Sequence, residues 1–177
     1  LGSFLWMLVG TGKTLTVLRF IHETNRTKNI IWSMPKSAIK SVAKEIQMVG
    51  WKVKMLVSRT SRLDNTFPVD QVAVVDGMLL EVGVVYLVGH DTLRLNLEKS
   101  SSMVVDVLAN HMSSSTLVYD EIHKVLPVGT KRTLNAHRLA ASAKQLVVLT
   151  GTPVRTNKLR ELMPWLQYCV NFNLTPS

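Results

Sequence analysis

The sequence is poor in cysteine, in aromatic residues and in long apolar runs. Its 177 residues include one cysteine, Cys169, so the chain can form neither an internal disulfide framework nor a thiolate metal cluster. No apolar run reaches the length of a membrane-spanning helix, and no charged flank precedes the short apolar stretch near the N-terminus. We therefore expect an intracellular protein without a membrane partner, in the cytoplasm of a prokaryote or virus-infected cell or in a nucleus.

Acidic residues are scarce outside the middle of the chain, and the formal net charge is +9. Residues 1–62 contain 11 Lys and Arg against 2 acids, residues 63–121 contain 2 against 9, and residues 122–177 contain 8 against 1. Two basic thirds suit a surface that binds a polyanion. Ordinary solvated side chains explain the same charge equally well.

The glycine-rich segment before residue 15 is typical of the last part of a phosphate-binding loop. In such loops backbone N–H groups approach the phosphates, a lysine reaches the β- and γ-phosphates, and a threonine hydroxyl ligates Mg²⁺. The residues concerned are Gly10, Thr11, Gly12, Lys13 and Thr14. The complete pattern has a glycine where this sequence has Met7. Taken alone, the segment could therefore also be a glycine-rich turn with a solvated lysine.

Two adjacent carboxylates, Asp120 and Glu121, follow an apolar run that ends at Tyr119. Carboxylates in this arrangement can hold Mg²⁺ and orient an attacking water. Because they occur together with the phosphate-loop segment, they favour a site for a nucleoside triphosphate and Mg²⁺.

Short apolar runs alternate with amphipathic segments along the chain. The expected strands are 4–9, 29–33, 53–57, 82–88, 116–119 and 145–149, and the expected helices are 14–24, 36–49, 102–111, 131–143 and 157–167. Continuous apolar runs are typical of parallel strands that are buried on both faces. We predict an α/β fold, a mostly parallel sheet with helices on both faces, whose ligands bind beyond the carboxyl ends of the strands.

Smaller features have simpler interpretations. The polar stretch 59–70 reads as a loop, and serine clusters at 100–102 and 113–115 are interpreted as caps of the helix between them. Trp32 and Trp51 stand in apolar surroundings, which favours core positions over base stacking.

The order of these motifs resembles the first RecA-like lobe of superfamily 2 helicases, in particular Swi/Snf-type double-stranded DNA translocases. The matching segments are Gly10 to Thr14, Pro35 to Ser37, Gly89 to Arg94, Asp120 to His123 and Leu149 to Pro153. The Thr-Gly-Thr-Pro string that ends at Pro153 is the most specific, because many other superfamily 2 branches have Ser-Ala-Thr there. His90, where an aromatic residue is common, and Ile122, where a small one is usual, indicate a divergent member.

The resemblance implies a RecA-like P-loop NTPase fold and site residues with separate roles. The catalytic set would be Lys13, Asp120, Glu121 and His123, and the cofactor would be ATP with a Mg²⁺ ion held by Thr14 and Asp120. The segment that couples nucleotide state to motion would consist of Thr150, Gly151 and Thr152. The phosphates of the nucleic acid would be contacted by Lys36, Ser37, Thr92 and Arg94. For His123 a packed structural role stays open. For residues 150–153, a turn without a signalling role also stays open as an alternative.

We expect residues 1–177 to form a single domain, the N-terminal lobe of a longer protein, because the chain starts at Leu1 and has no room for a second lobe. The resemblance implies an ATP hydrolase that contacts DNA, is poorly active as an isolated lobe, and partners a second lobe of the same polypeptide. Two alternatives remain. One is a catalytically weak, nucleotide-dependent nucleic-acid-binding module, and the other is an unrelated P-loop NTPase such as a metabolic kinase.

Overall fold

The structure is a computed structural model that describes residues 2–7, 11–24, 29–58, 68, 71–97, 102–124, 129–151, 162–163 and 165–167. At its centre lies a seven-stranded sheet in which every strand pair is parallel. The strands are β1 (Gly2–Trp6), β2 (Asn29–Met34), β3 (Lys52–Val57), β4 (Val72–Val74), β5 (Val84–Gly89), β6 (Ser115–Tyr119) and β7 (Gln145–Thr150). The predicted parallel α/β fold is confirmed.

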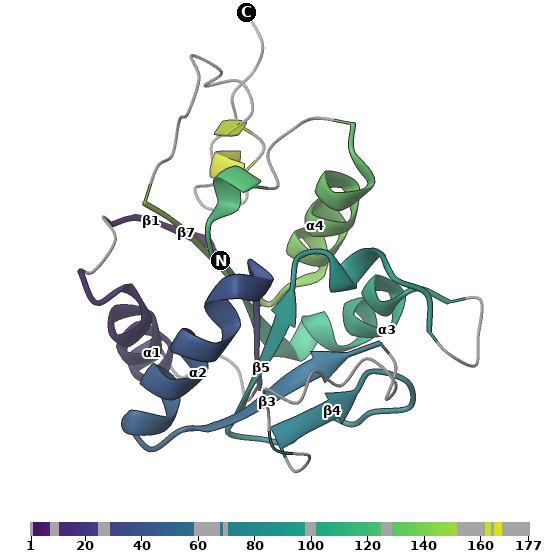
Figure 1. Ribbon diagram of the computed structural model, residues 1–177. Coiled ribbons are helices and arrows are strands. Elements are labelled where there is room, and N and C mark those ends of the chain that lie inside the picture. Colours follow the sequence, from purple (N-terminus) through teal and green to yellow (C-terminus); the bar gives the residue numbers. More distant parts are fainter. Residues whose placement is uncertain are drawn as a thin grey trace, which may run out of the picture.

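Helices cover both faces of this sheet, as Figure 1 shows. The longer helices are α1 (Lys13–Thr24), α2 (Ile39–Met48), α3 (Val104–His111) and α4 (Lys131–Ser142). α1 and α2 pack on one face and α3 and α4 on the other, so the sheet separates two apolar clusters. Alternate residues of one strand enter opposite clusters, since Ile31 packs with α3 and α4 while Trp32 packs with α1 and α2. This two-sided burial explains why the strands read as continuous apolar runs.

The strand order is β1-β7-β6-β2-β5-β3-β4. β7 therefore lies between β1 and β6, and its residues pair with both neighbours. The carboxyl ends of β1, β7 and β6 consequently meet at one edge of the sheet, where the phosphate-loop segment and the Asp120-Glu121 pair follow. β6 and β7 are neighbours and pair from Thr116 to Tyr119 of β6.

Several local expectations need correction. β4 lies where no strand was expected, because its three residues are half-buried at the sheet edge and too few for a hydrophobic pattern. Ser102 is not the N-cap of α3; that position is Met103, whose N–H donates to the Asp106 carboxylate at 2.9 Å. At the other end of α3, Ser114 and Ser115 do donate to a free carbonyl, that of His111.

Other expectations are confirmed or lie outside the described residues. Trp32 is fully buried, and Trp51 packs partly buried against the same cluster. The expected helix 36–49 begins with a 3-10 turn, η1 (Lys36–Ala38), before α2. Most of the expected helix 157–167 and of the loop 59–70 lies outside the described residues. In the part of the chain that the structure describes, no helix is long and apolar enough to cross a membrane.

Candidate functional site

The phosphate-loop segment runs into α1, whose first two residues are Lys13 and Thr14. Gly12 has a φ of 78°, a left-handed conformation that suits glycine, and its carbonyl accepts the N–H of Thr16 at 3.0 Å. α1 then starts at Lys13, so the free N–H groups of its first turn lie beside the loop. Thr11 and Gly12 are exposed, whereas Thr14 is buried. Gly10 lies outside the described residues.

Lys13 reaches across the sheet edge to Glu121. Its Nζ atom lies 3.1 Å from Oε1 of Glu121, and the two side chains are 13% and 21% exposed. The contact joins the start of α1 to the residue pair after β6, which are remote in sequence. The predicted lysine and the predicted carboxylate therefore belong to one site.

Glu121 has a φ of 52°, which makes it the one non-glycine residue with positive φ in the described part of the chain. A residue with a Cβ in this region costs of order 1–3 kcal/mol, and such residues cluster at functional sites. The backbone is held there by a hydrogen bond from the Glu121 N–H to Oδ1 of Asp120 at 2.9 Å. The strained turn directs the Glu121 side chain toward Lys13.

His123 lies on the other side of the same carboxylate. Its Nδ1 atom is 3.1 Å from Oε2 of Glu121 and 3.2 Å from Oγ1 of Thr150, and the His123 side chain is 5% exposed. An ionised carboxylate can only accept hydrogen bonds, so Nδ1 carries the proton in this contact. His123 thus connects the end of β6 with the end of β7. Gly151, which follows Thr150, is buried, and Thr152 lies outside the described residues.

Asp120 is 7% exposed, and burial raises its pKa while the nearby Lys13 ammonium lowers it. Its carboxylate and the Thr14 hydroxyl are oxygen donors of the kind that Mg²⁺ prefers. No group of three His, Cys, Asp or Glu side chains forms a metal cluster among the described residues. A cation here would therefore need phosphate oxygens as further ligands, which is how Mg²⁺ is usually held in nucleotide sites.

Two residues beneath Asp120 had no assigned site role in the sequence-based prediction. The ring of His90 lies between the Ser33 hydroxyl, 2.8 Å from Nδ1, and the Asp120 carbonyl, 2.9 Å from Nε2. Burial lowers the pKa of His90 to about 4. The available signal was the departure of His90 from the usual aromatic residue. The hydrogen-bond partner itself is visible only in the tertiary structure.

The predicted nucleic-acid contacts converge on one cleft of about 250 Å³. Lys36, Thr92 and Arg94 line it, and the exposed Ser37 follows Lys36 in η1 without lining it. These residues come from the segments after β2 and β5, which are adjacent strands. Asp91 also lines the cleft and lies 3.5 Å from Arg94. The cleft therefore combines two cations with one carboxylate.

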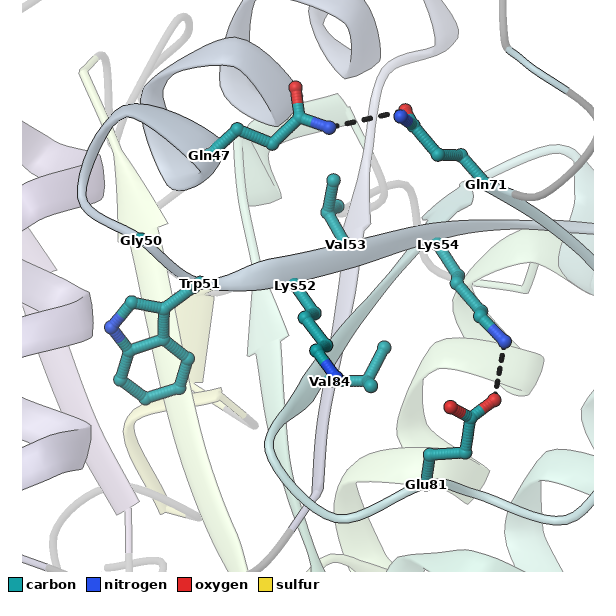
Figure 2. Close-up of a pocket in the computed structure, with 9 residues that line it drawn as sticks. All are labelled: Gln47, Gly50, Trp51, Lys52, Val53, Lys54, Gln71, Glu81 and Val84. Carbon is teal, nitrogen blue, oxygen red and sulfur yellow. Dashed lines mark hydrogen bonds and ion pairs between the residues drawn. The ribbon is translucent and has the colours of Figure 1, made fainter.

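A larger cavity, of about 430 Å³, lies at the opposite end of the strands (Figure 2). Its lining includes Lys52 and Val84, the first residues of β3 and β5. None of the predicted site residues lines it. Ligands of parallel sheets bind beyond the carboxyl ends of the strands, so the position of this cavity does not support a role in the predicted chemistry, despite its size.

Known proteins share both the sequence pattern and the fold. No protein-family model matches the chain. DNA excision repair protein ERCC-6-like of Danio rerio is 26% identical over 160 residues, which cover 87% of this chain and 10% of that protein. The Sulfolobus solfataricus SWI2/SNF2 ATPase core in complex with dsDNA matches 95% of this chain and 31% of its own, with 19% identity and a TM-score of 0.62. The chain resembles a Swi/Snf-type ATPase lobe.

The recognition based on the motifs is thus confirmed, as is the RecA-like α/β fold. The chain spans about a tenth of its curated relative and under a third of the solved ATPase core.

Proposed function

We propose that this chain is the ATP-hydrolysing lobe of a superfamily 2, Swi/Snf-type double-stranded DNA translocase. The observation that carries the proposal is the continuous contact from Lys13 through Glu121 to His123 and Thr150. It joins the phosphate-loop segment, the acidic pair and the end of β7 within one site.

Lys13 neutralises the charge of the β- and γ-phosphates of ATP, and the N–H groups of the first turn of α1 bind their oxygens. Thr14 and Asp120 would hold a Mg²⁺ ion, which would neutralise phosphate charge when bound. In the structure Lys13 pairs with the Glu121 carboxylate. Nucleotide binding therefore exchanges one anionic partner of Lys13 for another.

Glu121 orients the attacking water once Lys13 has turned to the phosphates. His123 holds the second carboxylate oxygen, which leaves Oε1 to accept a hydrogen bond from that water. Because His123 also contacts Thr150, a movement of the Glu121 carboxylate is transmitted through His123 to the end of β7. Gly151 and Thr152 follow there, and we assign this segment the coupling role.

Lys36, Ser37, Thr92 and Arg94 contact the phosphate backbone of duplex DNA. Three of them line one cleft, and contacts to phosphates position a protein without reading sequence. The solved SWI2/SNF2 ATPase core with the same fold is a complex with dsDNA, which supports duplex over single-stranded nucleic acid.

A second lobe of the same polypeptide completes the catalytic site. The chain covers a minor part of both similar proteins. In the superfamily that it resembles, the other lobe supplies arginines that stabilise the transition state. Residues 1–177 would thus be one domain of a larger motor.

The deciding experiment compares two variants of the full-length protein that contains this chain. Lys13→Ala should abolish binding of a fluorescent ATP analogue. Glu121→Gln should retain binding, tightened by up to about fivefold, because a partly exposed ion pair that competes for Lys13 is worth up to about 1 kcal/mol. It should also abolish phosphate release.

Matched controls are Lys52→Ala, an exposed lysine at the far end of β3, and Glu23→Gln, an exposed carboxylate on α1. Both should behave as wild type in binding and hydrolysis. Equal ATP binding by Lys13→Ala and Lys52→Ala would refute the nucleotide site. Binding without turnover in the wild-type protein would favour the nucleotide-dependent binding module instead.

A further inference from the structure

Both backbone groups of Asp120 are held by residues from neighbouring strand ends. The Asp120 N–H donates to the carbonyl of Ser33 at 2.8 Å. The Asp120 carbonyl lies 2.9 Å from Nε2 of His90, and the Ser33 hydroxyl closes the ring at 2.8 Å from Nδ1. Three residues from the ends of β2, β5 and β6 thus form a closed hydrogen-bonded ring.

The donors and acceptors in this ring follow from chemistry. A carbonyl oxygen can only accept, so the proton of the His90 ring lies on Nε2. Nδ1 then has a lone pair and accepts the Ser33 hydroxyl. His90 is 4% exposed, and the backbone N–H of His90 donates to the Met34 carbonyl at 2.9 Å. A neutral His90 imidazole therefore makes both of its hydrogen bonds in this cycle, as donor to Asp120 and as acceptor from Ser33.

The residues immediately after His90 form the proposed DNA cleft. His90 is followed by Asp91 and by the 3-10 turn η4 (Thr92–Arg94), and Thr92 and Arg94 line the cleft. A Cβ at Gly89 would lie 3.2 Å from the Thr92 hydroxyl, so the turn is wound closely against the end of β5. Thr92 and Arg94 therefore belong to a turn that follows His90 directly and packs against the strand end that carries it.

Asp91 anchors the same turn to α4. Its carboxylate pairs with Arg132, which also donates to the carbonyl of Lys124 at 3.2 Å. Lys124 ends the 3-10 turn η6 (Ile122–Lys124) that follows Glu121. The segment from 90 to 94 is thus connected to the acidic pair from two sides, through His90 to Asp120 and through Asp91 to Lys124.

We propose that His90 is a positioning residue that holds Asp120 in place and couples the DNA cleft to it. The role rests on the proposed function, in which Asp120 is a Mg²⁺ ligand and Thr92 and Arg94 contact DNA. Groups that orient a metal ligand typically change metal affinity or activity by about 10- to 100-fold when they are removed. We therefore expect an effect of this size from the loss of the Nε2 donor.

A purely structural role for His90 makes a different prediction. The ring stacks on Tyr119 with centroids 5.7 Å apart and planes at 18°, so an aromatic side chain could fill the same space. If packing alone matters, His90→Phe should be as active as wild type. If the hydrogen bond matters, His90→Phe should fail although it keeps the stacking.

Two amide side chains distinguish the role of Nε2 from that of Nδ1 of His90. A glutamine places its amide nitrogen near the position of Nε2 and can still donate to the Asp120 carbonyl. An asparagine reaches only the level of Nδ1 and cannot. His90→Gln and His90→Asn therefore carry the same functional group and differ in the one bond under test.

The experiment uses the full-length protein with saturating duplex DNA. We expect kcat for ATP to fall at least about tenfold in His90→Asn and His90→Phe and to stay within about threefold of wild type in His90→Gln. The Kd for DNA should change less than about twofold, since no phosphate contact is removed. The stimulation of kcat by DNA should fall together with kcat.

Equilibrium binding supplies a readout that is independent of turnover. The Mg²⁺ concentration needed for half-maximal binding of a fluorescent ATP analogue should rise about tenfold in His90→Asn and His90→Phe but not in His90→Gln. Ser33→Ala leaves the His90 imidazole in place and removes the hydroxyl that orients it. This variant should raise the half-maximal Mg²⁺ concentration by a smaller factor. His137→Asn, a half-buried ring in α4 stacked on Trp165, is the control.

The outcomes separate the two proposals. Wild-type activity in His90→Phe, or equal impairment of His90→Gln and His90→Asn, would overturn the positioning role while the ATPase assignment stands. No ATP hydrolysis by the wild-type protein would overturn the proposed function, and the positioning role with it. Thermal melting of each variant shows whether it is folded, and Ser33→Ala provides the test if a ring substitution unfolds the protein.

Discussion

The Nζ atom of Lys13 lies 3.1 Å from Oε1 of Glu121, although 108 positions separate the two residues in the sequence. The pair places the lysine that ends the glycine-rich segment in direct contact with the carboxylate that we propose to orient the attacking water. At 13% and 21% exposure, the two side chains neutralise each other's charge, so neither charge is left uncompensated at this low exposure. The γ-phosphate of ATP would take the place of the carboxylate beside Lys13.

The backbone of Glu121 provides a test of strain at the site. We expect Glu121→Gly to be more stable than Glu121→Ala by about 1 kcal/mol, because glycine adopts the observed φ of 52° without the cost that a Cβ adds. Both variants lose the carboxylate and should lose hydrolysis equally. Urea unfolding of the two proteins measures the difference. A more stable alanine variant would show that the left-handed turn is absent in solution.

His90 should make the stability of the chain pH-dependent. Burial lowers its pKa from 6.5 to about 4, so between these values the unfolded chain binds a proton that the folded chain does not. The contribution of His90 to the free energy of unfolding is therefore complete above about pH 6.5. It decreases as the pH falls toward 4, by up to about 3 kcal/mol. Urea unfolding at about pH 7 and about pH 4.5 should show this loss.

The variant His90→Gln isolates that contribution. Its unfolding free energy should fall less steeply over the same window, since glutamine does not titrate. Burial raises the pKa of Asp120, which acts in the opposite sense but is present in both proteins. Parallel stability curves for wild type and His90→Gln would contradict a buried neutral imidazole.

DNA binding should depend strongly on salt and little on sequence. Contacts to phosphates release counterions, so affinity should fall by at least about tenfold between low and moderate salt. Replacing Lys36 or Arg94 by alanine should reduce the slope of log Kd against log salt concentration by about 1 each. Lys52→Ala, at the other end of the strands, should leave it unchanged. Fluorescence anisotropy with two unrelated duplexes tests the prediction.

Residues 1–177 alone should hydrolyse ATP very slowly. Loss of an arginine supplied by a second lobe costs roughly 10³ to 10⁵ in rate, which the groups on this chain cannot replace. DNA-stimulated turnover of this segment should be compared with that of the full-length protein. Equal rates would mean that the segment is a self-contained NTPase and that no second lobe takes part.

Secondary structure was largely predictable because burial leaves a strong pattern. The continuous apolar run that includes Ile30 and Ile31 indicated a strand buried on both faces, and β2 is buried along its whole length. The cap of α3 was not predictable in the same way. The Met103 N–H is satisfied by Asp106, one turn into the helix, and serines nearby gave a competing signal. β4 has too few residues to leave a pattern.

The chemical groups of the site could be read directly from the amino-acid sequence: a glycine-rich segment before Lys13, an acidic pair, a Thr-Gly-Thr-Pro string, and apolar runs that dictate a parallel sheet. Which of these groups contact one another depends on the fold. The strand order brings Thr150 to His123, and the ends of β2 and β5 bring Ser33 and His90 to Asp120. Local propensity is set by neighbours in sequence, whereas hydrogen bonds across strand ends depend on packing over the whole sheet. Sequence pattern therefore could not reveal them.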